Sequence, residues 1–226
     1  MKKITLWAGL WALSLTSFAQ TSGSLSTTSA GSKYDPLALF HPLFNMQPGN
    51  DYRSGSGAPG PRYWQNRADY QINVSLDDQK NSIAGEVTIT YRNNSPESLP
   101  FLWLQLDQNA FSDTSRASRT TPVAGGRFGN LGFAGGLNIT SVTTEQDKAK
   151  FAPTPYAITD TRMQVRLAEP VKPGGEVKVK VAYSFKIPEY GSDRMGQLKR
   201  KDGVIYEIAQ WYPRMCVYDD IEGWNV

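Results

Sequence analysis

The sequence predicts an all-β fold, an antiparallel twisted sandwich or saddle that follows a disordered N-terminal tail. Three observations predict it. Apolar and polar residues alternate with a period of two in several long runs, as in half-buried strands. Turn-forming Asn, Asp, Gly and Pro residues separate these runs. Neither a sustained helical period nor an internal repeat is visible in the 226 residues.

Residues 1–19 are predicted to be a cleaved signal peptide. Lys2 and Lys3 precede an apolar run over residues 4–15, and Ser17 and Ala19 provide the small side chains that a signal peptidase recognises. The apolar run is shorter than the ~20 residues that a bilayer-spanning helix needs. We therefore expect export to the periplasm or the extracellular space, with no membrane span after cleavage.

Residues 20–61 are rich in Ser, Thr, Gly and Pro and are expected to form a flexible tail. An apolar island over residues 34–44, which contains His41, interrupts this composition. The sequence leaves two alternatives open for the island: docking on a folded surface as a short helix or clip, or local collapse within a linker.

Residues 62–226 are predicted to form the β-domain, which begins with a hairpin. Apolar side chains alternate from Tyr70 to Leu76 and again from Ile83 to Tyr91, and the polar residues 77–82 between them are typical of a turn. A third strand over residues 101–106 is apolar on nearly both faces, so we expect it to lie in the centre of a sheet.

A loop rich in Ser, Thr, Gly and Arg is expected over residues 112–136, and the strands resume after it. Strand patterns occur at residues 137–143, 156–159, 163–167 and 177–185, the last with the clearest alternation. Residues 201–203 form a hairpin turn that leads into a strand over residues 204–206.

Charge and cysteine content exclude several classes of protein. Removal of Lys2 and Lys3 with the signal peptide lowers the net charge from +3 to +1, which gives no electrostatic reason to expect binding to nucleic acid or to an anionic membrane. Cys216 is the only cysteine, so an internal disulfide is excluded and a packed core must stabilise the domain. We expect Cys216 to be a small buried apolar residue.

The chain lacks the residues of a hydrolytic centre. A catalytic zinc site needs three protein ligands and a serine triad needs a histidine, yet His41 is the only histidine and lies in the apolar island. Residues 125–130 resemble a glycine-rich phosphate loop but no helix is predicted after them, and residues 198–201 are expected to be a solvated strand end. The acidic residues Asp219, Asp220 and Glu222 are interpreted as an ordinary exposed loop, so we expect no metal and no cofactor in this chain.

Two segments resemble the N-terminal saddle domain of aminopeptidase-N-like (gluzincin) zinc metallopeptidases. The first comprises residues 69–77 and 83–95, with an Ile-x-Gly-x-Val-x-Ile strand and an Asn-Asn-Ser turn. The second comprises residues 206–215 and 217–220, where an aromatic-Pro pair precedes an aromatic-Asp pair. The order and spacing of the two segments make the resemblance more specific than either segment alone.

The resemblance implies a function in a longer protein. It implies a downstream catalytic domain that carries His-Glu-x-x-His and a later Glu as zinc ligands and hydrolyses peptides, with this chain as a C-terminally incomplete, non-catalytic domain that shapes the substrate cleft. Glu207 and Gln210 are the candidates for holding the free amino group of the substrate, and Trp211 and Tyr212 are expected near the interface with the catalytic domain.

Two other functions fit the same sequence. The domain can be a stand-alone exported β-sandwich that binds glycans or protein partners through exposed aromatic residues such as Tyr63 and Trp64. It can also be a structural or adhesive surface domain without a small ligand.

Overall fold

The computed structural model describes residues 49–120, 133–146, 150–189 and 195–226. The predicted signal peptide (1–19), the apolar island with His41 and the glycine-rich stretch 125–130 lie outside these residues. In the described part of the chain no helix is long and apolar enough to cross a bilayer.

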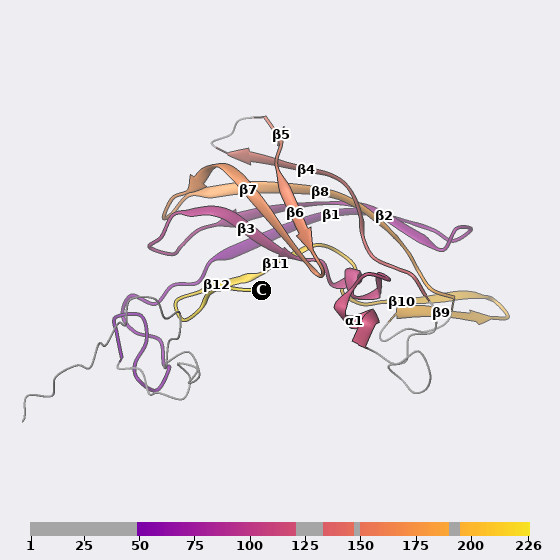
Figure 1. Cartoon of the computed structure of the whole chain (residues 1–226), viewed down its shortest axis with the longest axis horizontal. Coiled ribbons are helices and arrows are strands. Elements are labelled where there is room, and N and C mark those ends of the chain that lie inside the picture. The colour runs from indigo at the N-terminus through magenta and orange to yellow at the C-terminus, as the bar shows by residue number, and fades with distance from the viewer. Residues whose placement is uncertain (1–48, 121–132, 147–149, 190–194) are drawn as a thin grey trace, which may run out of the picture. The chain divides into compact units, whose positions relative to one another are not determined.

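Two antiparallel sheets make up most of the domain (Figure 1). The larger has the order β1-β2-β8-β4-β5, with bounds β1 Arg67–Asp77, β2 Ser82–Arg92, β8 Glu176–Lys186, β4 Asn138–Gln146 and β5 Ala152–Pro153. The smaller has the order β11-β3-β7-β6, with bounds β11 Arg214–Met215, β3 Leu99–Gln105, β7 Arg162–Val171 and β6 Tyr156–Thr159. The predicted all-β antiparallel sandwich or saddle is confirmed.

Short elements complete the fold. Two further two-stranded sheets pair β9 with β10 and β12 with β13, and the helical elements are single turns. Their bounds are β9 Met195–Arg200, β10 Gly203–Ile208, β12 Val217–Asp219, β13 Gly223–Asn225, the 3-10 helix η2 Asp107–Phe111 and α1 Arg116–Thr120. Helix α1 lies where the sequence predicts only a loop, because a single turn is too short to show a helical period. The turn is capped by the hydrogen bond from the Ser118 amide to Ser115 Oγ (2.9 Å).

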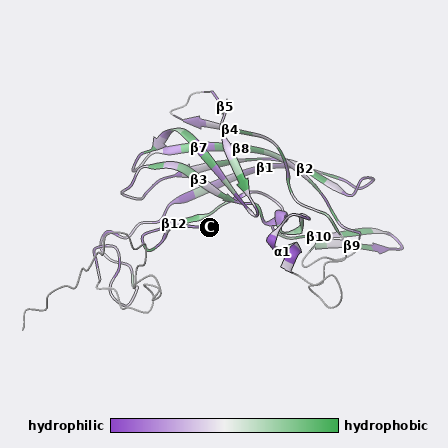
Figure 2. Cartoon of the chain, in the orientation of Figure 1, coloured by the Kyte–Doolittle hydropathy of each residue, from purple (hydrophilic) through white to green (hydrophobic). Residues whose placement is uncertain are grey.

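The alternating runs form strands as predicted, but β1, which was expected to be half-buried, leaves most of its apolar side chains exposed. In β2 and β8 every second side chain is buried, and Val87 and Val181 face each other across the antiparallel ladder without solvent exposure. Residues Leu102 and Leu104 of β3 are equally buried, and β3 lies between β11 and β7, which confirms its central position. Figure 2 shows the resulting green, apolar stripes along the strands of both sheets. These side chains belong to one continuous core shared by the two sheets.

A buried asparagine joins the two sheets at one end. Asn93, which follows β2, is fully buried and donates from Nδ2 to the carbonyls of Glu97 (2.6 Å) and Val171 (2.9 Å). Its Oδ1 accepts bonds from the amide of Ser95 (3.1 Å) and from the hydroxyl of Ser95 (2.6 Å). Its main chain bonds to the turn at Gly174 and Gly175, which connects β7 with β8. The Asn-Asn-Ser turn of the sequence is thus an internal link between β2, β3 and β7.

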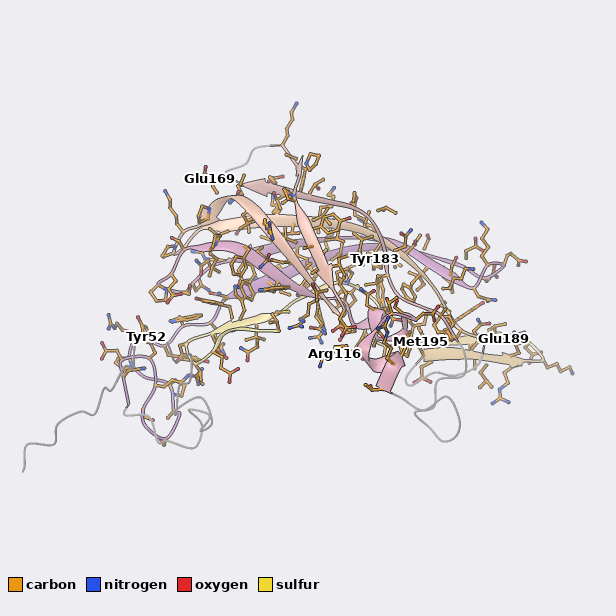
Figure 3. All side chains as sticks on the ribbon, viewed as in Figure 1. Tyr52, Arg116, Glu169, Tyr183, Glu189 and Met195 are labelled. Atoms are coloured by element: carbon orange, nitrogen blue, oxygen red, sulfur yellow. The ribbon has the colours of Figure 1, made fainter. Side chains whose placement is uncertain are left out.

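The last part of the predicted tail, residues 49–61, makes defined hydrogen bonds. The Gly57 amide donates to the Ser54 carbonyl (2.9 Å), and Arg53 and Pro59 form an isolated β-bridge. Tyr52, labelled in Figure 3, lies in this segment and packs against the guanidinium of Arg62 at 5.4 Å. These residues lie against the domain through the ion pair of Arg53 with Asp220.

Candidate functional site

The two residues expected to hold a substrate amino group lie at the end of β10. Glu207 is exposed and faces Gly196 of β9 across the hairpin, and Gln210 is exposed just beyond the strand. Both carboxylate and amide oxygens can accept bonds from an ammonium group there. Their exposure is compatible with a binding role, which stays a prediction.

The backbone at Gln210 is held in an uncommon conformation. Its φ is +52°, in the left-handed region that costs a non-glycine residue about 1 kcal/mol or more. Gln108 of η2 holds the bend from inside, because its Nε2 donates to the carbonyls of Ala209 (2.9 Å) and Gln210 (3.3 Å). Gln108 is 2% exposed, and its Oε1 has no hydrogen-bond partner among the described residues. The sequence gives no sign of this contact, since Gln108 and Gln210 lie far apart along the chain.

The aromatic-Pro segment packs on the first hairpin. The rings of Trp211 and Tyr212 meet edge to face at 5.1 Å, and Tyr212 meets Tyr70 of β1 in the same way at 5.8 Å. The Tyr70 hydroxyl accepts a hydrogen bond from the Met215 amide (2.9 Å). The two segments that carry the family resemblance are therefore in direct contact.

A hollow of about 470 Å³ lies beside this contact. It is bounded by the segment that leads into β1 and by the segment from β11 to β12. Aromatic side chains line much of it, namely Tyr63, Trp64, Tyr70, Tyr91 and Tyr218. Trp64 stacks on Tyr218 (5.8 Å between centroids), and Trp224 of β13 packs against both Tyr218 (5.1 Å) and Tyr91 (6.1 Å). Of these residues the sequence had suggested only Tyr63 and Trp64, which it expected to be exposed, whereas both are half-buried. Tyr70 follows them closely on β1, and Tyr91 and Tyr218 come from distant segments.

The charged groups around the hollow are paired with each other. Arg53 Nε contacts both carboxylate oxygens of Asp220 (2.9 and 2.8 Å), and its guanidinium lies 4.9 Å from the centre of the Tyr63 ring. The Asp220 side chain is 6% exposed. Arg67 is paired with Asp69 at 2.9 Å. The lining therefore offers polar groups without a strong net charge.

Burial favours the neutral form of two phenols of the hollow, those of Tyr70 and Tyr218. It raises the pKa of Tyr70, and together with the hydrogen bond to Glu97 it raises the pKa of Tyr218 to about 12. Burial also acts to raise the pKa of Asp219, but the amides of Glu222 and Ile221 bind its Oδ1 (both 2.9 Å) and hold that pKa below its ordinary value. At neutral pH the site thus presents neutral hydroxyl groups and one capped carboxylate.

The described residues do not fit a metal centre. They contain no group of three or more His, Cys, Asp and Glu side chains that could hold an ion. Asp219 caps the turn before β13, and Asp220 pairs with Arg53 and is 6% exposed. The expectation that these acidic residues form an ordinary exposed loop is therefore wrong for Asp219 and Asp220. Cys216 is buried, and burial raises the pKa of its thiol to about 11, so the thiol is unreactive at neutral pH.

Comparisons with known proteins give weak similarities. No protein-family model and no curated protein matches the chain. Among solved structures, it is similar to a two-domain M1 zinc metallopeptidase, a point mutant bound to L-arginine, at 13% identity and a TM-score of 0.37, over 60% of this chain and 24% of that one. An M1 zinc metallopeptidase from Deinococcus radiodurans aligns at 10% identity and a TM-score of 0.35, over 69% of this chain and 40% of that one. The chain thus spans well under half the length of these structures, and alignments at this level carry no argument about activity.

Proposed function

We propose that this chain is the non-catalytic N-terminal domain of an exported zinc-dependent metallopeptidase and shapes the cleft in which a peptide substrate binds. One observation supports the proposal most. The two segments that resemble the family, which are more than a hundred residues apart, pack against each other through Tyr70, Tyr212 and the bond from the Met215 amide to the Tyr70 hydroxyl. If each segment resembled the family by chance, there would be no reason to expect the two segments to contact each other.

In this proposal the chain contributes binding groups and the downstream domain contributes zinc. The described residues do not fit a zinc site, so no catalytic step is assigned to them. Glu207 and Gln210 accept hydrogen bonds from the substrate ammonium, and Trp211 and Tyr212 lie near the catalytic domain. Gln108 fixes the bend that carries Gln210, because it binds the Ala209 and Gln210 carbonyls.

Reading the coding sequence beyond the codon for Val226 gives the first test. The proposal expects an open frame with His-Glu-x-x-His and a later Glu. In that full-length protein, Gln210→Ala and Glu207→Ala are expected to raise KM for aminoacyl-p-nitroanilides about tenfold, the effect of losing one charge-assisted bond. Glu176→Gln, at an exposed position at the start of β8, is the control. An unchanged KM in both site variants would remove these residues from the substrate site.

The alternative function is a stand-alone exported module that binds glycans or protein partners. The hollow favours it, because Tyr63 and Trp64 both line a concave surface. A stop codon directly after a folded domain would favour this function over the first.

A further inference from the structure

We propose that the aromatic hollow is a binding site for a neutral saccharide. The hollow is the surface bounded by Tyr63, Trp64, Tyr70 and Tyr218 between the start of β1 and β12. The proposal gives the alternative binding function a ligand class and rests on that function. Its test is separate from the test of the peptidase proposal.

The size and lining of the hollow suit a small molecule with flat apolar faces. Its volume of about 470 Å³ falls within the range of about 300–1,000 Å³ that is common for small-molecule sites. The face of an aromatic ring is electron-rich, so it attracts the weakly positive C–H groups on the face of a pyranose ring. Trp64 and Tyr218 are stacked on each other and Trp224 supports Tyr218, which holds these rings in place before a ligand arrives.

Hydrogen-bonding capacity remains at the same surface. The Tyr70 hydroxyl accepts the bond from the Met215 amide, which leaves its own proton to donate. The Tyr63 hydroxyl accepts a bond from Gln65 Nε2 (2.9 Å) and keeps its proton in the same way. Gln65 is exposed and also lines the hollow, and its Oε1 can accept a hydrogen bond. Sugar hydroxyls donate and accept at once, so they match such a mixture of groups.

The charge balance argues against an ionic ligand. Arg53 is bound to both oxygens of Asp220, Arg67 pairs with Asp69, and the Asp219 carboxylate accepts two main-chain amides. An anion would have to compete with Asp220 for Arg53, and a cation would lie close to two guanidinium groups. A neutral ligand avoids both costs.

Binding to the full chain can be measured by isothermal titration calorimetry and saturation-transfer NMR. The probes are the neutral trisaccharides maltotriose, cellotriose and tri-N-acetylchitotriose. We expect at least one to bind with a single site, and Trp64→Ala to weaken it by about tenfold or more, since it removes the stacking surface. Tyr70→Phe keeps the ring but removes the hydroxyl, and is expected to weaken binding severalfold. The matched control is Tyr156→Ala, because Tyr156 is an exposed aromatic residue (41%) on β6 outside the hollow.

Several results would overturn the proposal. They are the absence of binding by all three trisaccharides, equal binding by the wild type and by a Trp64→Ala variant with wild-type circular dichroism, and tighter binding of sialyllactose, choline or hexaproline than of any neutral sugar. Hexaproline is included because proline-rich peptides also dock on aromatic grooves. None of these results affects the peptidase proposal, which depends on the reading frame and on KM.

Discussion

Asn93 offers the most direct test of how the two sheets are joined. Its side chain makes four hydrogen bonds in a fully buried position, and two of them satisfy the carbonyls of Glu97 and Val171. In Asn93→Ala the Val171 carbonyl loses a buried donor, which costs about 1–3 kcal/mol, and the other bonds contribute about 0.5–1.5 kcal/mol each. We therefore expect the variant to lose about 3–5 kcal/mol of unfolding free energy, a large part of the stability of a domain of this size.

The neighbouring Asn94 provides a matched control. Its Nδ2 also donates to a carbonyl, that of Gln65 (2.8 Å), but both groups are exposed and water can replace the bond. Asn94→Ala should therefore cost no more than about 1 kcal/mol. Guanidinium unfolding followed by tryptophan fluorescence measures both variants, provided that the m-value is unchanged.

A third variant adds a dependence on pH. Asn93→Asp places a carboxyl group where two carbonyls need donors, so burial raises its folded pKa above the ordinary value. The deficit in stability should then be smaller at pH 4 than at pH 7, since only the protonated form can donate. If Asn93→Ala costs no more than Asn94→Ala, or if the deficit of Asn93→Asp is the same at both pH values, the reasoning about this network is wrong.

The remaining predictions concern the core. Gly85→Ala should lower the unfolding free energy by about 1–3 kcal/mol, because its Cβ would lie 3.0 Å from the Tyr183 ring, and Tyr183→Leu should reduce that loss. The Tyr183 hydroxyl is buried without a partner among the described residues, so Tyr183→Phe should leave stability unchanged or raise it in urea unfolding. Burial raises the pKa of Tyr183 from 10.0 in the unfolded chain to about 12 in the folded domain, because the folded state favours the neutral phenol. The resulting contribution to the free energy of unfolding is fully present below pH 10 and is lost as the pH rises from 10 to 12. Thermal melts at pH 9 and 11 should show a smaller alkaline decrease in Tyr183→Phe. Cys216 should react with Ellman's reagent at pH 8 only after unfolding, and rapid native labelling would contradict its burial.

The strands could be predicted because their signal is local. Alternation from Ile83 to Tyr91 and from Val177 to Phe185 corresponds to β2 and β8 within one or two residues, since one face of each strand is buried and the other is not. The turn at residues 201–203 likewise predicts the hairpin of β9 and β10. The family resemblance adds Glu207 and Gln210 as candidates, which local patterns alone do not select.

The candidate site could be predicted only in part, because its contacts are distant in sequence. Arg53 and Asp220 are 167 residues apart, Tyr70 and Met215 are 145 apart, and Gln108 and Ala209 are 101 apart. Which residues become partners depends on how strands from different sheets pack together. The alternation of apolar and polar residues within a single strand carries no information about that packing. Tyr183 on β8 and Met195 on β9, both labelled in Figure 3, are 2% and 3% exposed.

The position of β8 in the larger sheet has a consequence for biosynthesis. The hairpin of β1 and β2 is complete once residue 92 has been made, but β2 pairs on its other side with β8, about ninety residues later. Until then the apolar side chains of β2, among them Val87 and Ile89, have no sheet neighbour on that side to share the core. We therefore expect slow, late folding of the nascent chain and a need for chaperone protection during translation, because non-local strand pairing carries a large loop-closure entropy.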